Sequence, residues 1–303
     1  MRVVDGNLID FRQAGTRHRE GDIRFKHLLR GEQGSPQNYE FMIARTGAGF
    51  PSPAHRHNFD QIRYGLYGTF GDGKGLDVGV GQCGYYPEGT PYSIDSRESE
   101  VILLQFGGAS GWGFTHFPQL AKAYSELSQV GEFREGRFYR AHQVDEPTPK
   151  MQDGYEALWQ HIHGRPVVYP LPRYGRPVIM DPNAYAWRPI TEGVHRKILG
   201  AFTERSLEVG LLKLARSSSW ALSESAAPTL LYVLEGTGTV GLTDVRAGAA
   251  AEILPSEKPA LASRDGLLLF YVVLPIFDAS EVGMPAGASA HDRIPPQAPP
   301  SPA

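Results

Sequence analysis

The stretch that decides the fold is "GFPSPAHRHNFDQIRYGLYG", from Gly49 to Gly68. It places His55 and His57 one residue apart, follows them with Gln61, and then enters a strand-like run. Residues two apart on a β-strand point to the same side, so the two imidazoles can reach one point. Two histidines and an oxygen donor suit Zn, Fe, Ni, Cu or Mn. The stretch therefore predicts a polar, metal-binding site inside a β-structure.

The rest of the chain is rich in short strands. Strand-like segments separated by Gly or Pro fill residues 22–107 and return after about residue 195, which favours an antiparallel sandwich or barrel. Between them, 117–129 and 151–162 carry apolar residues at helical spacing and predict two helices. The segment 165–177 is too rich in proline for a central strand and is typical of a linker.

The two strand-rich halves predict an internal repeat. At an offset of 168 residues, Gly68 falls on Gly236, Pro87 falls on Pro255, and "VILLQF" falls on "LFYVVL". Three matches at one offset without gaps indicate two copies of one β-domain.

The opening stretch resembles the first motif of the cupin family, G-x5-H-x-H-x3-E-x6-G. Every spacing fits, and only the glutamate is replaced, by Gln61. The second cupin motif, G-x5-P-x-G-x2-H, is matched by Gly81, Pro87 and Gly89, with Tyr92 in place of the histidine. The resemblance covers about residues 22–107 well and the C-terminal half more weakly, through the repeat. It implies two tandem cupin jelly-roll barrels, a bicupin, joined by a short helical bridge.

The resemblance also implies a metal site at His55, His57, Gln61 and Tyr92, because cupin enzymes commonly hold a metal with the residues at these four motif positions. Gln61 offers a neutral amide oxygen, and an unperturbed phenol such as Tyr92 has a pKa of about 10. Tyr92 is therefore predicted either as a ligand or as a hydrogen-bonding group beside a three-ligand site. Asp60 is one residue out of register and is expected to point away.

The same register assigns further residues to the barrel interior. If Gln61 points inward, Arg63, Gly65 and Tyr67 should also point inward. A buried arginine is costly unless it is paired, so Arg63 is a candidate anchor for a substrate carboxylate or phenolate. Gly65 would leave room beside it. Tyr85 or Tyr86, and Gln105, complete the predicted pocket.

Other candidate residues carry weaker signals. His161 and His163 form a second H-x-H, but they end a predicted helix, where residues two apart do not share a face. Surface or packing roles are expected for His116, His142 and His195, and Cys83 is expected to be a small buried hydrophobe. At the repeat offset, the four predicted ligands become Ser223, Ser225, Thr229 and Ala260, so the second barrel is expected to bind no metal and to cover apolar sheet surface.

The predicted organisation has four parts. Residues 1–115 form the N-terminal cupin domain with the metal site, 116–190 the helical bridge and Pro-rich linker, 191–280 the degenerate second cupin domain, and 281–303 a disordered tail rich in Pro and Ala. The fold class is all-β.

The predicted function is a metal-dependent small-molecule enzyme with one divalent transition metal per chain. We expect an oxygenase using Fe(II), with Mn, Ni, Cu or Zn as alternatives, that acts on a phenolic, enolic or carboxylate substrate with Tyr92 and Arg63 as catalytic residues. A redox-neutral isomerase, lyase or cyclase and a non-catalytic ligand-binding cupin are the alternatives. The formal charge of -3 gives no support to a nucleic-acid partner, and neither a signal peptide nor a membrane-spanning run is visible, so we expect a cytoplasmic protein, by family habit a homodimer.

Overall fold

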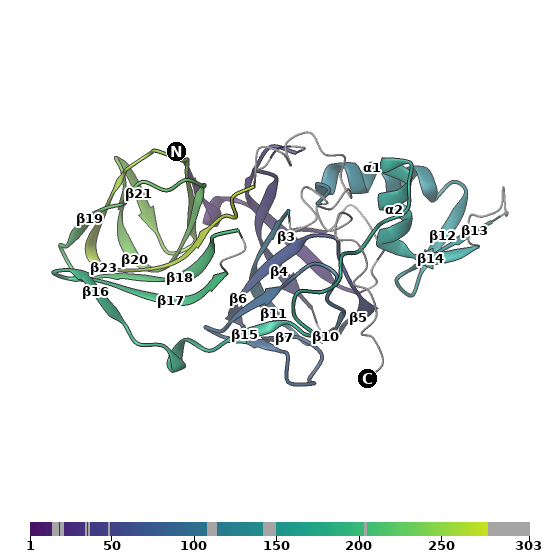
Figure 1. Ribbon diagram of the computed structural model, residues 1–303, viewed down its shortest axis with the longest axis horizontal. Helices are drawn as coiled ribbons and strands as arrows, with labels where there is room; N and C mark the ends of the chain where they lie inside the picture. Colours follow the sequence, from purple (N-terminus) through teal and green to yellow (C-terminus); the bar gives the residue numbers. More distant parts are fainter. Residues whose placement is uncertain are drawn as a thin grey trace, which may run out of the picture.

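The computed structural model of the chain describes residues 1–13, 18, 21–33, 35, 37–47, 49–107, 114–141, 150–202 and 205–277. Two β-barrels lie side by side, and a small helical lobe lies on the far side of the first barrel (Figure 1). The predicted all-β class with two tandem barrels is confirmed. The C-terminal tail and His142 lie outside the described residues. The structure contains one chain, and the homodimer stays a prediction.

The first barrel is built on a seven-stranded antiparallel sheet, with two short strand pairs closing its other side. In spatial order the sheet contains β15 (Val178–Met180), β9 (Cys83–Tyr86), β6 (Asp60–Tyr67), β11 (Ser99–Phe106), β4 (Tyr39–Thr46), β3 (Ile23–Arg30) and β2 (Arg12–Gln13). The short pairs are β5 (Phe50–His55) with β10 (Tyr92–Ser96), and β7 (Thr69–Phe70) with β8 (Val78–Gly79).

The second barrel repeats this order of strands. Its sheet contains β1 (Arg2–Asp5), β22 (Ala249–Ile253), β20 (Thr229–Val240), β23 (Ala260–Val273), β18 (Leu207–Leu214), β17 (Val194–Phe202) and β16 (Arg188–Thr191). Two short strands join it, β19 (Ser219–Ala221) against β23 and β21 (Thr243–Arg246) against β20. Two 3₁₀ turns, η1 (Gly6–Leu8) and η2 (Pro182–Ala184), follow β1 and β15.

The repeat holds at the level of single residues. Strand β4 begins at Tyr39 and β18 begins at Leu207, which is the predicted offset of 168. In the first barrel Gln61 pairs with Gln105, and in the second Thr229 pairs with Val273, at the same offset on both strands. The two barrels are therefore copies in strand order, and they share a register along β4, β6 and β11 of the first and β18, β20 and β23 of the second, whereas the pairing of β22 is shifted by one residue from that of β9.

The barrels exchange one edge strand each. Strand β1, at the start of the chain, pairs with β22 of the second barrel, whereas β15, which precedes the second barrel, pairs with β9 of the first. The domain boundaries predicted from the sequence do not include this exchange. It ties each barrel to a segment that lies far away in the sequence.

Three apolar clusters explain how the barrels pack. One fills the interior of the first barrel, with Phe25, Met42 and Leu103 among its members, and one fills the interior of the second. The largest joins the outer faces of the two sheets and includes Ile62 and Phe270. The second barrel thus covers apolar sheet surface of the first, as expected.

The helical lobe connects the barrels in sequence but packs only on the first. It contains α1 (Phe117–Leu127), α2 (Gly154–His163) and a three-stranded sheet of β12 (Gly131–Arg134), β13 (Arg137–Arg140) and β14 (Met151–Asp153). The second helix starts three residues later than predicted, because the carboxylate of Asp153 accepts the N–H groups of Tyr155 and Glu156 and caps it. Phe59 of the first barrel belongs to the core of this lobe.

No helix in the described part of the chain is both long and apolar enough to cross a membrane.

Candidate functional site

The alternation along β6 points two polar side chains into the first barrel. Gln61 and Arg63 are 2% and 3% exposed, whereas Ile62 and Tyr64, between and after them, belong to the cluster between the barrels. The predicted inward register is therefore present at these positions. It fails at Tyr67, which is 57% exposed, because a register shift at Glu100 ends the regular pairing of β6 with β11.

Gly65 does not leave the room that the sequence suggested. A Cβ at this position would lie 2.0 Å from the backbone oxygen of Gly79, so the neighbouring backbone already fills the space. Glycine is needed here for the close approach of two chain segments. The space beside Arg63 is bounded by aromatic rings instead.

Arg63 is a buried cation surrounded by aromatic rings. Its guanidinium carbon lies 3.8 Å from the ring centroid of Tyr86, 4.6 Å from that of Tyr92 and 5.0 Å from that of Phe70. Its Nε and Nη2 donate to Gln61 Oε1 over 3.2 and 2.7 Å. No carboxylate of the described residues lies within ion-pair distance of it. A buried charge whose partners are neutral oxygens and π-faces has the capacity to bind an anion.

Gln61, His57 and Tyr92 form one hydrogen-bonded group next to Arg63. Because Gln61 Oε1 accepts from Arg63, its Nε2 is the atom that donates to His57 Nδ1, over 3.0 Å. The Tyr92 hydroxyl lies 2.9 Å from the same Nδ1 and 3.4 Å from Gln61 Oε1. The amide orientation assigned from Arg63 makes His57 Nδ1 an acceptor.

His55 lies at the edge of this group. Its ring meets the His57 ring edge-on with centroids 5.0 Å apart, and its centroid lies 4.6 Å from that of Tyr92, the residue it pairs with across β5 and β10. His55 Nδ1 lies 2.7 Å from the backbone oxygen of Pro53 and donates to it. All five residues singled out from the sequence therefore come together at one end of the first barrel.

The four predicted ligands do not fit a divalent cation in this arrangement. The amide oxygen of Gln61 accepts two hydrogen bonds from Arg63, and Nδ1 of His57 accepts the Gln61 amide. The donor set contains no carboxylate, and a guanidinium charge lies against it, so a divalent ion would meet repulsion without a compensating anion. In the described part of the chain, no three His, Cys, Asp or Glu side chains gather as a metal site. The ligand assignment stays a prediction.

Asp60 points away from the site, as expected. Its carboxylate accepts from the Tyr85 hydroxyl and the Glu88 N–H, each over 2.8 Å, on the outer side of the barrel. Burial raises its pKa. The open choice between Tyr85 and Tyr86 is thereby resolved, because Tyr86 faces Arg63. Burial raises the pKa of Tyr86, and the Arg63 charge opposes the shift.

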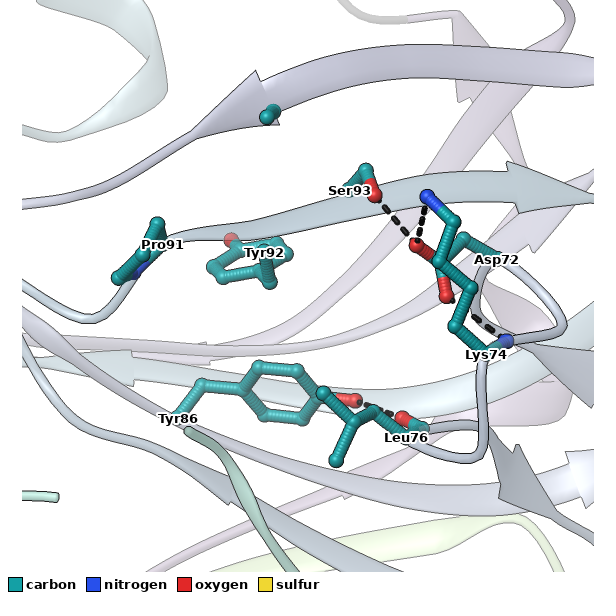
Figure 2. A pocket seen from close by; sticks show the side chains of 8 residues that line it. Asp72, Lys74, Leu76, Tyr86, Pro91, Tyr92 and Ser93 are labelled. Carbon is teal, nitrogen blue, oxygen red and sulfur yellow. Dashed lines mark hydrogen bonds and ion pairs between the residues drawn. The ribbon is translucent and has the colours of Figure 1, made fainter. Parts of the chain in front are cut away.

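A cavity of about 220 Å³ reaches the aromatic rings around Arg63 from outside. Tyr86 of β9 and Tyr92 of β10 form its wall, with ring centroids 5.1 Å apart (Figure 2). Asp72 lies at its rim, where it pairs with Lys74 and accepts a hydrogen bond from Ser93 (Figure 2). The same two rings contact the guanidinium of Arg63, whose central carbon lies 3.8 Å from the Tyr86 centroid and 4.6 Å from the Tyr92 centroid.

The lobe covers the end of the barrel that carries the histidines. The ring of Tyr155, at the start of α2, meets the His57 ring edge-on at 5.2 Å, and its hydroxyl donates to Asn58 Oδ1 over 2.9 Å. Phe59 stacks on His57 with ring centroids 4.5 Å apart, and it also meets the Tyr155 ring edge-on at 5.9 Å. The orientation of His57 is therefore set by the lobe as well as by the barrel.

Two inward side chains near the site were not singled out from the sequence. Glu40 is fully buried on β4, and His27 on β3 lies 3.8 Å from its carboxylate. Burial raises the pKa of Glu40 to about 7 and lowers the pKa of His27 to about 4. The signal in the sequence was a lone carboxylate in the apolar strand "YEFMIA". Gln105, which was predicted for the pocket, pairs with Glu40 across the sheet.

The remaining histidines serve packing and surface contacts. His161 bonds Glu126 on α1 and His163 bonds Thr115, so the second H-x-H does not converge. His116 is buried, and burial lowers its pKa to about 4. Cys83 is fully buried, and burial raises the pKa of its thiol.

The second barrel carries no comparable group among its described residues. By the strand register, Leu231 stands where Arg63 stands, Thr229 where Gln61 stands, and Val273 where Gln105 stands. Ala260, which matches Tyr92 at the sequence offset, pairs with Ala221, whereas Tyr92 pairs with His55, the counterpart of Ser223. The polar interior is specific to the first barrel.

Comparison with solved structures shows the fold. The chain is similar to a "putative dioxygenase" from Nostoc punctiforme, with a TM-score of 0.58 and 13% identity over 92% of this chain and 85% of that one. It is also similar to oxalate decarboxylase from Bacillus subtilis, with a TM-score of 0.54 and 15% identity over 91% of this chain and 76% of that one. A further structure of that enzyme, described for its Mn(II) centres, matches equally well (TM-score 0.54, 15% identity, 92% and 78% covered). The fold is that of two tandem cupin barrels. No family model matches the sequence, and no curated protein matches it.

Proposed function

We propose that the first barrel is the active site of a small-molecule enzyme that binds a carboxylate or enolate substrate at Arg63. The observation that carries this proposal is the guanidinium itself, which is 3% exposed and has a neutral amide oxygen as its hydrogen-bond acceptor. A substrate carboxylate would supply the anion that Arg63 lacks, through the planar fork that guanidinium groups offer. The second barrel, with Leu231 at this position, provides no such anchor.

The neighbouring groups support proton transfer as the chemistry. The Tyr92 hydroxyl and His57 Nδ1 lie 2.9 Å apart and can exchange a proton. When the hydroxyl proton passes to His57 Nδ1, that nitrogen gives up the hydrogen bond it accepts from the Gln61 amide, and the Tyr92 oxygen becomes a base beside the bound substrate. Arg63 would stabilise the negative charge that develops on an enolate after removal of a proton next to a carbonyl. The reaction class is therefore a redox-neutral isomerisation or elimination, with Arg63 as anchor and Tyr92 and His57 as the proton pair.

The test is hydrogen exchange at the substrate carbon in heavy water. Proton NMR would follow a panel of 2-oxo and 3-oxo carboxylic acids with the wild type, Arg63→Met and Tyr92→Phe, in the presence of EDTA. Tyr271→Phe, which removes a tyrosine hydroxyl from the second barrel, is the matched control. We expect chelator-resistant exchange with the wild type and the control, and a loss of at least about 100-fold in both site variants.

Two results would overturn this assignment. Acids that bind in an Arg63-dependent manner, with no exchange for any of them, would make the barrel a ligand-binding module. Failure of every acid to bind would remove Arg63 as an anion anchor.

The metal-dependent oxygenase predicted from the sequence is the second candidate. Its support is the edge-on approach of His55 and His57, together with the Mn(II) centres described for a similar solved structure. Binding would require Gln61 to turn away from Arg63. Mass spectrometry of untagged wild type and His55→Ala/His57→Ala, after incubation with Fe(II), Mn(II), Ni(II) and Zn(II), tests this candidate. About one ion per chain that is lost in the double variant would establish a metal site, and the identity of the ion would then decide between oxygen chemistry with a redox-active metal and Lewis-acid chemistry with a redox-inert one.

A further inference from the structure

Three polar side chains form a row across the floor of the first barrel. Glu40 of β4 pairs with Gln105 of β11, and Gln105 pairs with Gln61 of β6. On each strand the neighbours in sequence, such as Phe41, Leu104 and Ile62, belong to the cluster between the barrels. Since adjacent residues of a strand point to opposite faces, all three polar side chains face the interior that contains Arg63.

At the Glu40 end of this row, two side chains carry hydrogen-bond acceptors for which the structure describes no protein donor. Glu40 Oε1 pairs with Arg30, whereas Glu40 Oε2 is buried with no hydrogen-bond partner among the described residues. The side chain of Gln105, 9% exposed, likewise makes no hydrogen bond within the described part of the chain. A buried carboxylate oxygen without a donor costs on the order of 1–3 kcal/mol, so such an oxygen calls for a ligand or water in native proteins.

In the second barrel, a hydroxyl group of the protein itself donates to the carboxylate at the corresponding position. Glu208 occupies the position of Glu40 at the repeat offset, and the Tyr271 hydroxyl donates to it over 2.7 Å. The residue of the first barrel that corresponds to Tyr271 is Leu103, which has no donor. The first barrel therefore keeps the carboxylate and omits the protein hydroxyl that would bind it.

We propose that the substrate supplies this missing hydroxyl: Glu40 and Gln105 bind the donor end of a hydroxycarboxylic acid whose carboxylate is held by Arg63. This inference rests on the proposed function, and it names the substrate class for the same site. Arg30 already neutralises the charge of Glu40, so a neutral hydroxyl is favoured over an ammonium group. The other groups near the Glu40 carboxylate are the His27 imidazole, 3.8 Å away, and the Phe117 N–H, and burial lowers the pKa of His27 to about 4.

Isothermal calorimetry at pH 8 with matched acids tests the proposal. The probes are butyrate, 3-hydroxybutyrate, 4-hydroxybutyrate and 4-aminobutyrate, with hexanoate and 6-hydroxyhexanoate as a longer pair. We expect at least one hydroxy acid to bind wild type about tenfold tighter than its unsubstituted partner, which is the contribution of one hydrogen bond to a charged group. The corresponding amino acid should bind more weakly than the hydroxy acid.

Four variants separate this inference from the proposed function. Glu40→Gln and Gln105→Leu should each remove most of the preference, bringing the ratio of hydroxy-acid to plain-acid affinity close to one. Arg63→Met should abolish binding of both, and Glu208→Gln, the matched control in the second barrel, should change neither. Since Glu40→Gln leaves Arg30 unpaired, thermal melts check its fold, and Gln105→Leu provides an independent readout.

The contrary outcomes are distinct. Arg63-dependent binding of plain and hydroxy acids with equal affinity would contradict the proposed binding of a hydroxyl by Glu40 and Gln105. It would leave the proposed binding of the carboxylate by Arg63 unaffected. A preference that survives in both Glu40→Gln and Gln105→Leu would also contradict the proposed binding of the hydroxyl. Failure of all acids to bind would remove the proposed function together with this inference.

Discussion

The two barrels share a strand order and, along their central strands, a register, but they differ in what they enclose. In the first, the inward positions of β6 and β11 carry Arg63 and Gln105. In the second, the same positions carry Leu231 and Val273, and the interior is an apolar cluster. The outward positions of both barrels are apolar and bury one another. The fold is thus maintained by the face that the barrels share, which leaves the enclosed face of one barrel available for chemistry.

The largest expected effect comes from moving the arginine to the other barrel. Leu231→Arg would place a charge at a position that is 1% exposed and surrounded by Val233, Leu269 and other apolar residues. Because an unpaired buried charge is among the most costly substitutions, we expect a loss of about 4–5 kcal/mol in the free energy of unfolding or failure to fold. Urea denaturation would measure it, with Leu231→Met as the control. A loss below about 1 kcal/mol would show that the second barrel also tolerates a buried cation.

A smaller effect, with a defined pH dependence, is expected at Glu40. Its pKa is raised from 4.5 to about 7, with burial as the largest cause and Arg30 opposing. Between these values the unfolded chain has released a proton that the folded chain retains, so this group lowers stability as the pH rises. Relative to Glu40→Gln, the wild type should lose up to about 3 kcal/mol between pH 4.5 and 7.

Urea titrations at several pH values measure this difference. Glu208→Gln, the same substitution at the corresponding position of the second barrel, is measured beside it as the matched control. A difference between wild type and Glu40→Gln that does not change with pH would contradict the buried, partly unpartnered carboxylate.

The sequence predicts which positions face inward better than it predicts what those side chains bond. A period of two was enough to place Gln61 and Arg63 inside the barrel. The hydrogen bond from Arg63 to the Gln61 amide oxygen depends on side-chain conformations, which the spacing of residues in the sequence does not predict. Tyr67 was misplaced because the register shift at Glu100 depends on the partner strand.

Glu40 is an inward-facing residue that the sequence pattern did not reveal. Within "YEFMIA" the apolar neighbours dominate the pattern, and the strand is predicted without regard to its one charged residue. The exchange of β1 and β15 between the barrels is equally hidden, because short edge strands carry little pattern and their partners lie more than ninety residues away.

Converting the first barrel toward the second should stabilise it. Arg63→Met replaces a buried cation by an apolar side chain of similar length among the rings of Tyr86, Tyr92 and Phe70. Replacing buried charges by well-packed apolar residues is often neutral or stabilising, and we expect a gain of about 2 kcal/mol, measured by urea denaturation and thermal melts. A loss of more than about 1 kcal/mol would instead mean that Arg63 serves the structure.

The smallest expected effect tests whether the first barrel's unpartnered carboxylate is tolerable in the second. Tyr271→Phe removes the hydroxyl that donates to Glu208 and leaves the apolar ring in place. Glu208 is 26% exposed on its side chain and lies 3.6 Å from Arg196, so water and that arginine can compensate in part. We therefore expect a loss of about 1 kcal/mol in the free energy of unfolding, measured by urea denaturation beside wild type. Compensation by water is open to Glu208 and closed to the buried Glu40, which is why the same missing hydroxyl is a minor defect in one barrel and a binding determinant in the other. A loss as large as 3 kcal/mol would show that water does not compensate the carboxylate of Glu208 for the lost hydrogen bond. The difference between Glu208 and Glu40 would then have to come from their arginine partners, Arg196 and Arg30.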